Sequence, residues 1–281
     1  MLERVRIVLV RPRRGGNVGA AARVLKNMGL GELVLVAPRT RVGAVGERMA
    51  AHARDLLARR RVVPDLPSAL HDCVLAVGTA GRDLAQLTSL EPRAAAIEIV
   101  REARRGPVAV VFGPEDHGLS NAELGLCQRL VRIPTSDAYP SLNLAQAVAV
   151  CGYELRLAAL AQADDVAPAV ERAADDECAP ATSAEREALL AHLEQALGAV
   201  GFLSRQNPGH ILADVRSLLA RAGLTRRDVR IWRGIARQML WAASRGEVRA
   251  RDAQSGAAKD EERTLSDATG SATAPAARRR R

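Results

Sequence analysis

The sequence predicts an α/β fold, with a parallel sheet covered by helices on both faces and a small all-α extension at the carboxyl end. Two observations predict the sheet: short runs of β-branched and apolar residues alternate with amphipathic segments, and the links between them are short. The extension is predicted by three further segments in which apolar residues recur at helical spacing. A chain of 281 residues is long enough to bury a full core alongside such an extension.

Six apolar runs have the length and composition of buried strands. They span residues 6–10, 32–36, 62–63, 73–77, 108–112 and 130–133. Helices are predicted between them, at residues 17–29, 47–59, 65–71, 92–104 and 120–126. We expect Asn17 to cap the first helix and Gly29 to end it. A long amphipathic helix follows Asn143, and either Ser141 or Asn143 is placed to cap it.

Three of the predicted strands end in small residues, glycine or proline. These ends are residues 78–81, 113–114 and 133–134. Such residues leave backbone groups accessible, and ligands of parallel α/β sheets bind at the carboxyl ends of the strands. The sequence therefore predicts a ligand site where these three ends meet the polar residues before the long helix.

We divide the chain into four regions. Residues 1–162 form the sheet domain, 163–181 an acidic linker, 182–247 the helical extension, and 248–281 a polar tail that ends in four arginines and that we expect to be disordered. In the extension, Thr182 and Glu185 form a capping box, Asn207 caps a second helix, and Thr225 opens a third. Arginines crowd this third helix, and a solvated face explains them as well as an RNA contact does.

The net charge of +9 favours a polyanionic partner. The excess of 41 Lys and Arg over 32 Asp and Glu is modest, so charge by itself favours nucleic acid without establishing it. Aromatic residues make up 2% of the chain, which argues against a platform for stacking bases. Any contact with RNA should therefore depend mainly on arginine and phosphate.

The cysteines and the charged residues bear on the compartment. Cys73, Cys127, Cys151 and Cys178 show no C-x-x-C spacing and no paired histidines, so we expect reduced thiols rather than a metal site or disulfides. Charges near the amino terminus and within the long apolar helix fit neither a signal peptide nor a membrane span. We therefore expect a cytoplasmic protein.

Three segments carry a resemblance to a known family. They are N-V-G-A-A-A-R at residues 17–23, F-G-P-E-D-H-G-L at 112–119, and the stretch at 133–143 that contains I-P and Y-P-S-L-N. In order and spacing they resemble the three motifs of SPOUT-class RNA ribose 2′-O-methyltransferases of the TrmH/TrmJ type. The resemblance is closest to the TrmJ family, because it continues through H-L-E-Q-A-L-G-A-V-G-F at 192–202 and R-I-W-R-G-I at 230–235. It covers roughly residues 1–241.

The resemblance implies a trefoil knot at the end of the sheet domain, S-adenosylmethionine as methyl donor, and a homodimer. It implies methylation of a tRNA ribose 2′-hydroxyl, with the first nucleotide of the anticodon loop (cytidine or uridine at tRNA position 32) as the expected target. It places the methyl donor against Thr79, Ala80, Gly81, Gly113, Ile133, Pro140, Ser141 and Leu142. It gives catalytic roles to Arg23, Glu115, Ser141 and Asn143, and substrate contacts to Asn17 and Arg23. This chain has alanine after Thr79, where the family pattern usually has serine.

The chemistry of these residues favours positioning over proton abstraction. A guanidinium stays protonated at ordinary pH, so we expect Arg23 to orient the 2′-hydroxyl or a neighbouring phosphate and to stabilise the developing alkoxide. A solvated helix arginine would show the same spacing. Glu115, Asp116 and His117 are consecutive on a turn and cannot easily face one ion, so we expect no metal there and give Glu115 a positioning role.

Other functions fit parts of the sequence. An RNA-binding module of the same fold without turnover is disfavoured because the four catalytic positions are intact. A nicotinamide enzyme is disfavoured because Gly15 and Gly16 follow the first strand without a G-x-G-x-x-G pattern. Within the methyltransferases, another tRNA position and ribosomal RNA are the alternative targets.

Overall fold

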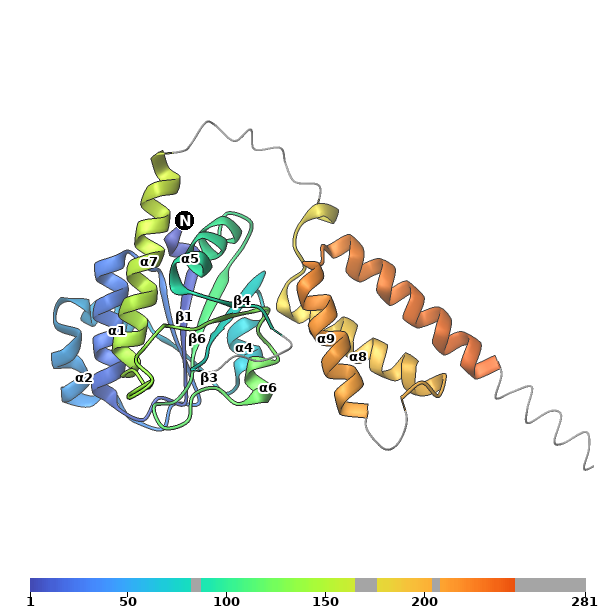
Figure 1. Ribbon diagram of the computed structural model, residues 1–281, viewed down its shortest axis with the longest axis horizontal. Helices are drawn as coiled ribbons and strands as arrows, with labels where there is room; N and C mark the ends of the chain where they lie inside the picture. Colours follow the sequence, from blue (N-terminus) through green and yellow to red (C-terminus); the bar gives the residue numbers. More distant parts are fainter. Residues whose placement is uncertain (82–86, 165–175, 204–207, 246–281) are drawn as a thin grey trace, which may run out of the picture.

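The described residues fold around one parallel sheet of seven strands in the order β3-β2-β1-β6-β4-β7-β5 (Figure 1). The structure is a computed structural model and describes residues 1–81, 87–164, 176–203 and 208–245. The pairings between these strands are parallel, which confirms the predicted α/β class. The strands are β1 (Val5–Val10), β2 (Glu32–Val36), β3 (Arg61–Val63), β4 (Leu75–Thr79), β5 (Ser89–Leu90), β6 (Val108–Phe112) and β7 (Arg129–Val131).

Helices cover both faces of the sheet. They are α1 (Gly15–Met28), α2 (Gly43–Ala50), α3 (Arg54–Ala58), α4 (Leu66–Leu70), α5 (Pro92–Glu102), α6 (Asn121–Leu124) and α7 (Leu144–Asp164). The helices of the extension are α8 (Ser183–Ala199), α9 (Pro208–Ala222) and a further helix at 226–245. Ile7 and Leu9 of β1 pack with α1, α5 and α7, whereas Val8 and Val10 pack with α4 and α6. Because both faces are covered, the central strands are continuous apolar runs in the sequence.

β2 and β6 span the predicted residues, whereas other boundaries shift. β4 begins two residues later than predicted, and β5 is missing from the prediction because Ser89 and Leu90 form no apolar run. The helix predicted at 47–59 is interrupted. α2 ends at Ala50, Ala51 has a left-handed backbone (φ 48°), and a short 3-10 turn leads into α3.

The prediction that Asn17 caps α1 is wrong. α1 begins at Gly15, which places Asn17 inside the first turn. Only glycine fits at position 15, because a Cβ there would lie 2.5 Å from the carbonyl oxygen of Val42. The early helix start leaves the Asn17 side chain available for contacts with distant segments. Gly29, with φ 74°, ends the helix as predicted.

α7 is long and apolar, and the segment Leu144–Gln162 has a mean hydropathy of 1.3. Its length and composition would suit a membrane span, but a core helix of a folded domain meets the same criteria. One face, which includes Val148 and Leu155, is buried where α7 packs against α1 and α5. The opposite face carries a second apolar stripe, exposed by 36% to 52%, at Val150, Tyr153, Leu157 and Leu160.

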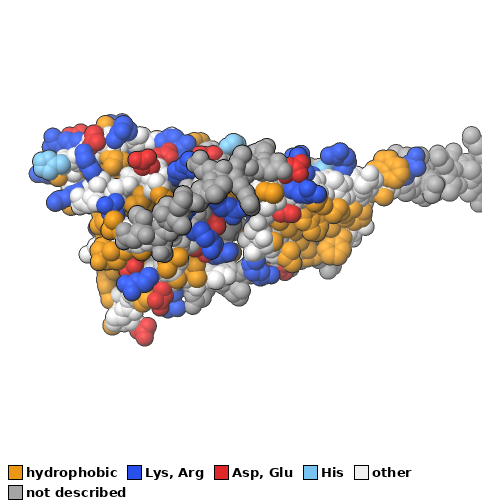
Figure 2. Space-filling view, turned by 90° about the horizontal axis from the view of Figure 1, so that it is seen from above, with side chains coloured by type: hydrophobic (Ala, Val, Ile, Leu, Met, Phe, Trp, Pro, Cys, Tyr) orange, Lys and Arg blue, Asp and Glu red, His pale blue; other side chains and the backbone are white. Residues whose placement is uncertain are grey.

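The helical extension has a small core of its own, in which Leu189 and Leu193 of α8 pack with Leu219 of α9 and Val229 of the last helix. Figure 1 shows the extension beside α4 and α6, on the side of the sheet opposite α1 and α7. Figure 2 shows hydrophobic side chains gathered on its outer surface as well. The extension therefore has a hydrophobic core of its own and lies against one face of the sheet domain.

Two predicted helix starts in the extension are confirmed. Thr182 and Glu185 form both bonds of a capping box, and the Thr225 hydroxyl accepts the N–H of Asp228 (3.2 Å) at the start of helix 226–245. Asn207, predicted to cap α9, lies outside the described residues. So does the tail at 248–281 and most of the linker at 163–181.

Candidate functional site

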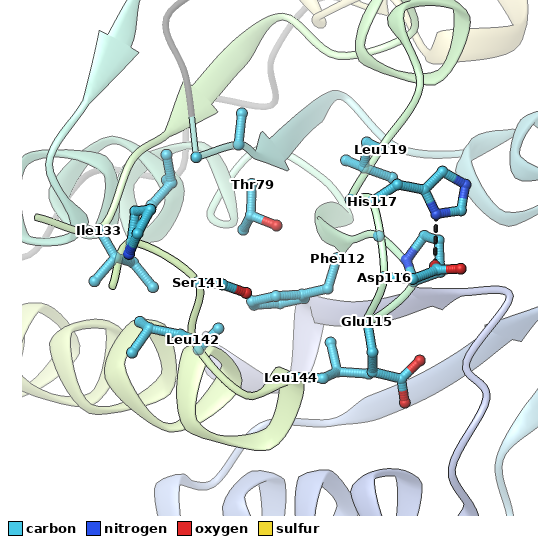
Figure 3. A pocket seen from close by; sticks show the side chains of 18 of the residues that line it. Thr79, Phe112, Glu115, Asp116, His117, Leu119, Ile133, Ser141, Leu142 and Leu144 are labelled. Carbon is cyan, nitrogen blue, oxygen red and sulfur yellow. Dashed lines mark hydrogen bonds and ion pairs between the residues drawn. The ribbon is translucent and has the colours of Figure 1, made fainter. Parts of the chain in front are cut away.

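The loops that follow β4, β6 and β7 meet the segment before α7 and enclose a cavity of about 380 Å³ (Figure 3). In this view Ile133 and Leu142 lie at one end of the cavity, Asp116 and His117 lie at the other, and Thr79 lies between them. Four separate parts of the chain thus form one concave site at the carboxyl edge of the sheet. This edge is where ligands bind in parallel α/β folds.

The residues predicted to face a methyl donor all line this cavity. They are Thr79, Ala80, Gly81, Gly113, Ile133, Pro140, Ser141 and Leu142. Glu115 lines the cavity too. Asn17 and Asn143 are not among the lining residues, but Asn17 donates a hydrogen bond to Glu115, and Asn143 donates one to Asn17. The structure therefore brings together three motif segments that are far apart in the sequence.

Glu115 is the centre of these contacts. Its carboxylate accepts hydrogen bonds from the backbone N–H groups of Arg13 (2.9 Å) and Arg14 (3.2 Å) and from the side-chain amide of Asn17 (2.9 Å). Burial raises the pKa of Glu115, but these hydrogen bonds outweigh burial and leave the pKa below its ordinary value. Glu115 is thus a charged anchor at the amino end of α1, where a helix favours negative charge.

Asn143 connects the third motif segment to the first. Its side-chain amide donates to Oδ1 of Asn17 (3.1 Å), and its own Oδ1 accepts the N–H of Ala145 (2.9 Å). Asn143, rather than Ser141, is therefore the residue that caps α7. A continuous series of bonds runs from Asn143 through Asn17 to Glu115, so the start of α7, the start of α1 and the loop after β6 are held in one arrangement.

Gly113 is required by the loop that it begins. A Cβ at this position would lie 2.2 Å from the backbone carbon of Gly118 and 2.3 Å from the nitrogen of Leu119. The loop after β6 can fold back over its own start only because residue 113 has no side chain. Any larger residue there would displace the loop that carries Glu115, in addition to narrowing the cavity.

The apolar wall of the cavity is absent from the prediction. It is formed by Phe112, Leu119, Leu124, Val131, Leu144 and Ala147. In the sequence these residues are indistinguishable from other buried members of strands and helices, because periodicity reports burial and does not separate a cavity wall from a packed core.

Arg11 and Glu123 form a second connection that the sequence did not reveal. Arg11 follows β1 with a left-handed backbone (φ 47°), and its guanidinium forms a two-pronged ion pair with Glu123, with Nη2 and Oε2 3.0 Å apart. Glu123 also completes a capping box with Ser120. The capping box is visible in the sequence, but its arginine partner lies 112 residues away.

Asp116 and His117 are occupied with each other and with Arg13. His117 Nδ1 lies 2.5 Å from an oxygen of Asp116, and the other Asp116 oxygen pairs with Arg13 (2.8 Å). Among the described residues, no group of three or more His, Cys, Asp or Glu side chains is placed to hold a metal ion.

Arg23 lies apart from the cavity. It is exposed on α1, is not among the lining residues, and forms no hydrogen bond or ion pair with a described residue. Its charge is therefore free for a ligand that approaches from solvent. Its predicted contact with a substrate stays a prediction.

Two family models match the sequence. The SpoU rRNA Methylase family matches residues 4–153, and the C-terminal domain of the tRNA methyltransferase TrmJ matches residues 184–252. Among known proteins, the tRNA (cytidine/uridine-2′-O-)-methyltransferase TrmJ of Yersinia enterocolitica is 39% identical over 236 residues, which cover 84% of this chain and 91% of that protein. TrmJ of Klebsiella pneumoniae is also 39% identical, with 96% of its length covered.

Solved structures agree with these matches. The crystal structure of TrmJ from Z. mobilis ZM4 superposes with a TM-score of 0.70 at 31% identity, over 83% of this chain and 98% of that one. A probable methyltransferase from Bordetella pertussis Tohama I superposes with a TM-score of 0.53 at 40% identity, over 56% and 97% of the two chains. The sheet, the cavity and these likenesses define an RNA methyltransferase. Within that class, the chain belongs to the SpoU methylase family and to its TrmJ branch.

Proposed function

We propose that this protein methylates the 2′-hydroxyl of a tRNA ribose, with S-adenosylmethionine as the methyl donor. The observation that carries the proposal is the convergence of three motif segments on one cavity, joined by the bonds from Asn143 through Asn17 to Glu115. The TrmJ relatives are named as cytidine/uridine methyltransferases of tRNA. The motif resemblance adds the position, which is the first nucleotide of the anticodon loop, tRNA position 32.

The cavity fits S-adenosylmethionine in size and lining. A volume of about 380 Å³ is within the range of small-molecule sites. Ile133 and Leu142 offer apolar surface to the adenine at one end (Figure 3). Residues 79–81 and 140–142 offer backbone groups, and a Cβ at Gly81 would meet no atom of a described residue within 4 Å.

When bound, the donor supplies a methyl group that its sulfonium already activates. The protein then has to hold the ribose oxygen in line with this methyl group and to exclude water. Ser141 and Asn143 stand before the first turn of α7, where free N–H groups and positive potential favour ribose and cofactor oxygens. Arg23 contributes a permanent positive charge for the 2′-oxygen or an adjacent phosphate.

Two arginine-bearing loops beside Glu115 offer a surface for the RNA backbone. The loop after β1 and the loop after β2 are in contact, since the N–H of Arg39 donates to the carbonyl oxygen of Pro12 (3.0 Å). Arg14, Arg39 and Arg41 are exposed on these loops, and none of their guanidinium groups forms an ion pair with a described carboxylate. Unpaired arginines of this kind bind phosphates, so we place the RNA strand across these loops.

The experiment is mass spectrometry of an unmodified tRNA transcript after incubation with the protein and S-adenosylmethionine. We expect one 2′-O-methylated nucleoside, at the first nucleotide of the anticodon loop. A transcript with a 2′-deoxyribose at that position should gain no methyl group, because the acceptor hydroxyl is missing. Methylation at another nucleotide, or of ribosomal RNA alone, would contradict the proposed target. Binding of tRNA without any methylation would show that the protein is an RNA-binding module without catalytic activity.

The remaining expectations belong to the same proposal. They are the trefoil knot around the cavity, the homodimer, the cytoplasmic location and the division into the four regions given above. The exposed stripe on α7 supports the homodimer, because uncovered apolar side chains on one helix face are typical of an interface between subunits. The stripe begins at Val150, in the turn of α7 that follows the lining residue Ala147, so the interface would lie close to the site.

We expect Leu157→Glu to convert the dimer into a monomer, because it places a charge in the centre of the α7 stripe. The measurement is light scattering at micromolar concentration. Val62→Glu on the edge strand β3 is the matched control, since Val62 is also exposed and should leave the dimer intact. A wild-type protein that is monomeric would contradict the homodimer, and a dimeric Leu157→Glu variant would place the interface elsewhere.

A further inference from the structure

The extension is attached to the turn between α4 and β4 by its first helical turn. The N–H of Ser183 donates to the carbonyl oxygen of Cys73 (2.9 Å), and the N–H of Ala184 donates to that of His71 (3.1 Å). The first N–H groups of a helix have no partner within the helix, and these two find theirs in the sheet domain. The start of α8 is therefore fixed against the residues that lead into β4.

Arg186 extends this attachment into the sheet. Its Nη1 donates to the carbonyl oxygens of Val74 (3.1 Å) and Ala181, and its Nη2 donates to Oε1 of Gln128 (3.2 Å). No carboxylate among the described residues forms an ion pair with Arg186. Burial lowers the pKa of Arg186 to about 10, so the guanidinium remains charged at neutral pH and depends on these three oxygens.

Gln128 joins the amino ends of two strands. Its Oε1 also accepts the N–H of Ala76 in β4 (2.8 Å), while its backbone N–H donates to the carbonyl oxygen of Ala76 (2.8 Å). Its side-chain amide donates to the carbonyl oxygen of Leu126 (3.1 Å). Gln128 directly precedes β7, so one side chain, oriented by Arg186, sets where β7 begins relative to β4.

The carboxyl ends of the same two strands form the cavity. β4 and β7 pair from Val77 with Arg129 to Thr79 with Val131, and the N–H of Ala80 continues the pairing to the carbonyl oxygen of Val131 (3.0 Å). Thr79, Ala80 and Val131 line the cavity. Strands rise about 3.3 Å per residue, so Ala76, which Gln128 contacts, lies only about 10 Å along β4 from the lining residue Thr79.

We propose that Arg186 is a positioning residue for the methyl-donor pocket: through Gln128 it holds β4 and β7 in the arrangement that forms the pocket wall. The helical extension is then a structural part of the donor site in the sheet domain. This inference rests on the proposed function, since it takes the donor to bind in that cavity.

The test compares Arg186→Met with Arg216→Met in the full-length protein. Arg216 is the matched control, because it is an arginine of the same extension that pairs with Glu187 (Nη2 to Oε2 2.9 Å) and has no bond to Gln128. We expect Arg186→Met to weaken S-adenosylhomocysteine binding about tenfold by calorimetry and to raise the KM for the donor similarly, with the KM for tRNA nearly unchanged. Arg216→Met should leave the donor affinity unchanged.

A second variant and a second readout separate positioning from folding. Gln128→Ala keeps the Ser183 and Ala184 bonds and should lose the same donor affinity as Arg186→Met, whereas Arg186→Lys should recover part of it. Hydrogen exchange of the Ala80 N–H should be faster in Arg186→Met and in Gln128→Ala than in Arg216→Met, with no ligand present.

The outcomes are distinct. Wild-type donor affinity and unchanged Ala80 exchange in both variants would overturn the proposal, and so would a loss confined to tRNA affinity. A wild-type protein that does not bind S-adenosylhomocysteine would instead overturn the proposed function, while the exchange measurement still decides whether Arg186 holds the two strands.

Discussion

Arg23→Ala is expected to lower the rate of methyl transfer to tRNA by about a hundredfold or more and to leave S-adenosylhomocysteine affinity nearly unchanged. We expect this because Arg23 is exposed on α1, outside the cavity, and forms no ion pair with a described residue. A charge placed in this way can act on a substrate that approaches from solvent, but it does not contribute to the wall against which the donor binds.

Single-turnover methylation measures the methyl-transfer rate of Arg23→Ala, and calorimetry measures its affinity for S-adenosylhomocysteine. Lys26→Ala is the control, because Lys26 is on the same helix and carries the same charge, but pairs with Asp55 (2.7 Å). It should leave the methylation rate within about twofold. Equal losses of rate and donor affinity in Arg23→Ala would show that Arg23 acts on the cofactor side of the site. An unchanged rate would show that Arg23 is a solvated surface residue.

Glu115→Gln is expected to reduce methylation by about a hundredfold through misplacement of the substrate-facing loops. Glutamine retains the shape but has only one oxygen for the three donors on Arg13, Arg14 and Asn17, and its amide group would face N–H groups. The start of α1 and the bond from Asn17 to Asn143 should shift together. Glu102→Gln is the control, at a partly buried carboxylate that pairs with Arg101 and Arg105 and lies outside the cavity lining, and it should leave the methylation rate nearly unchanged.

The stability lost in Glu115→Gln should depend on pH. The pKa of Glu115 is below its ordinary value of 4.5 in the folded protein, so its contribution to stability is present above the unfolded pKa and is lost as pH falls through the folded pKa. The difference in unfolding free energy between wild type and Glu115→Gln should therefore be largest at neutral pH and shrink below pH 4.5. Urea titrations at several pH values measure it. A difference that stays constant with pH would mean that the Glu115 charge does not stabilise the fold.

Much of the site was predictable because it lies where strands end. Residues 78–81, 113–114 and 133–134 stand out in the sequence as small residues, glycine or proline after apolar runs, and these ends do line one cavity. Gly29 and the capping box of Thr182 and Glu185 were equally visible, since a helix end needs only its immediate neighbours. The interruption at Ala51 was not, because the local sequence at 47–59 is helical throughout.

Local periodicity and motifs of adjacent residues were enough to identify the parallel α/β class, the strand ends that carry the site, and the family. Which side chains meet could be learned only from the folded chain. Glu115 binds the start of α1 about 100 residues before it, and Arg186 reaches Gln128 from 58 residues away. Such contacts depend on the packing of whole elements, and no local pattern encodes the partner of a charged or amide side chain. For the same reason, the role of the extension in the site becomes visible only when β4, β7 and α8 are seen together.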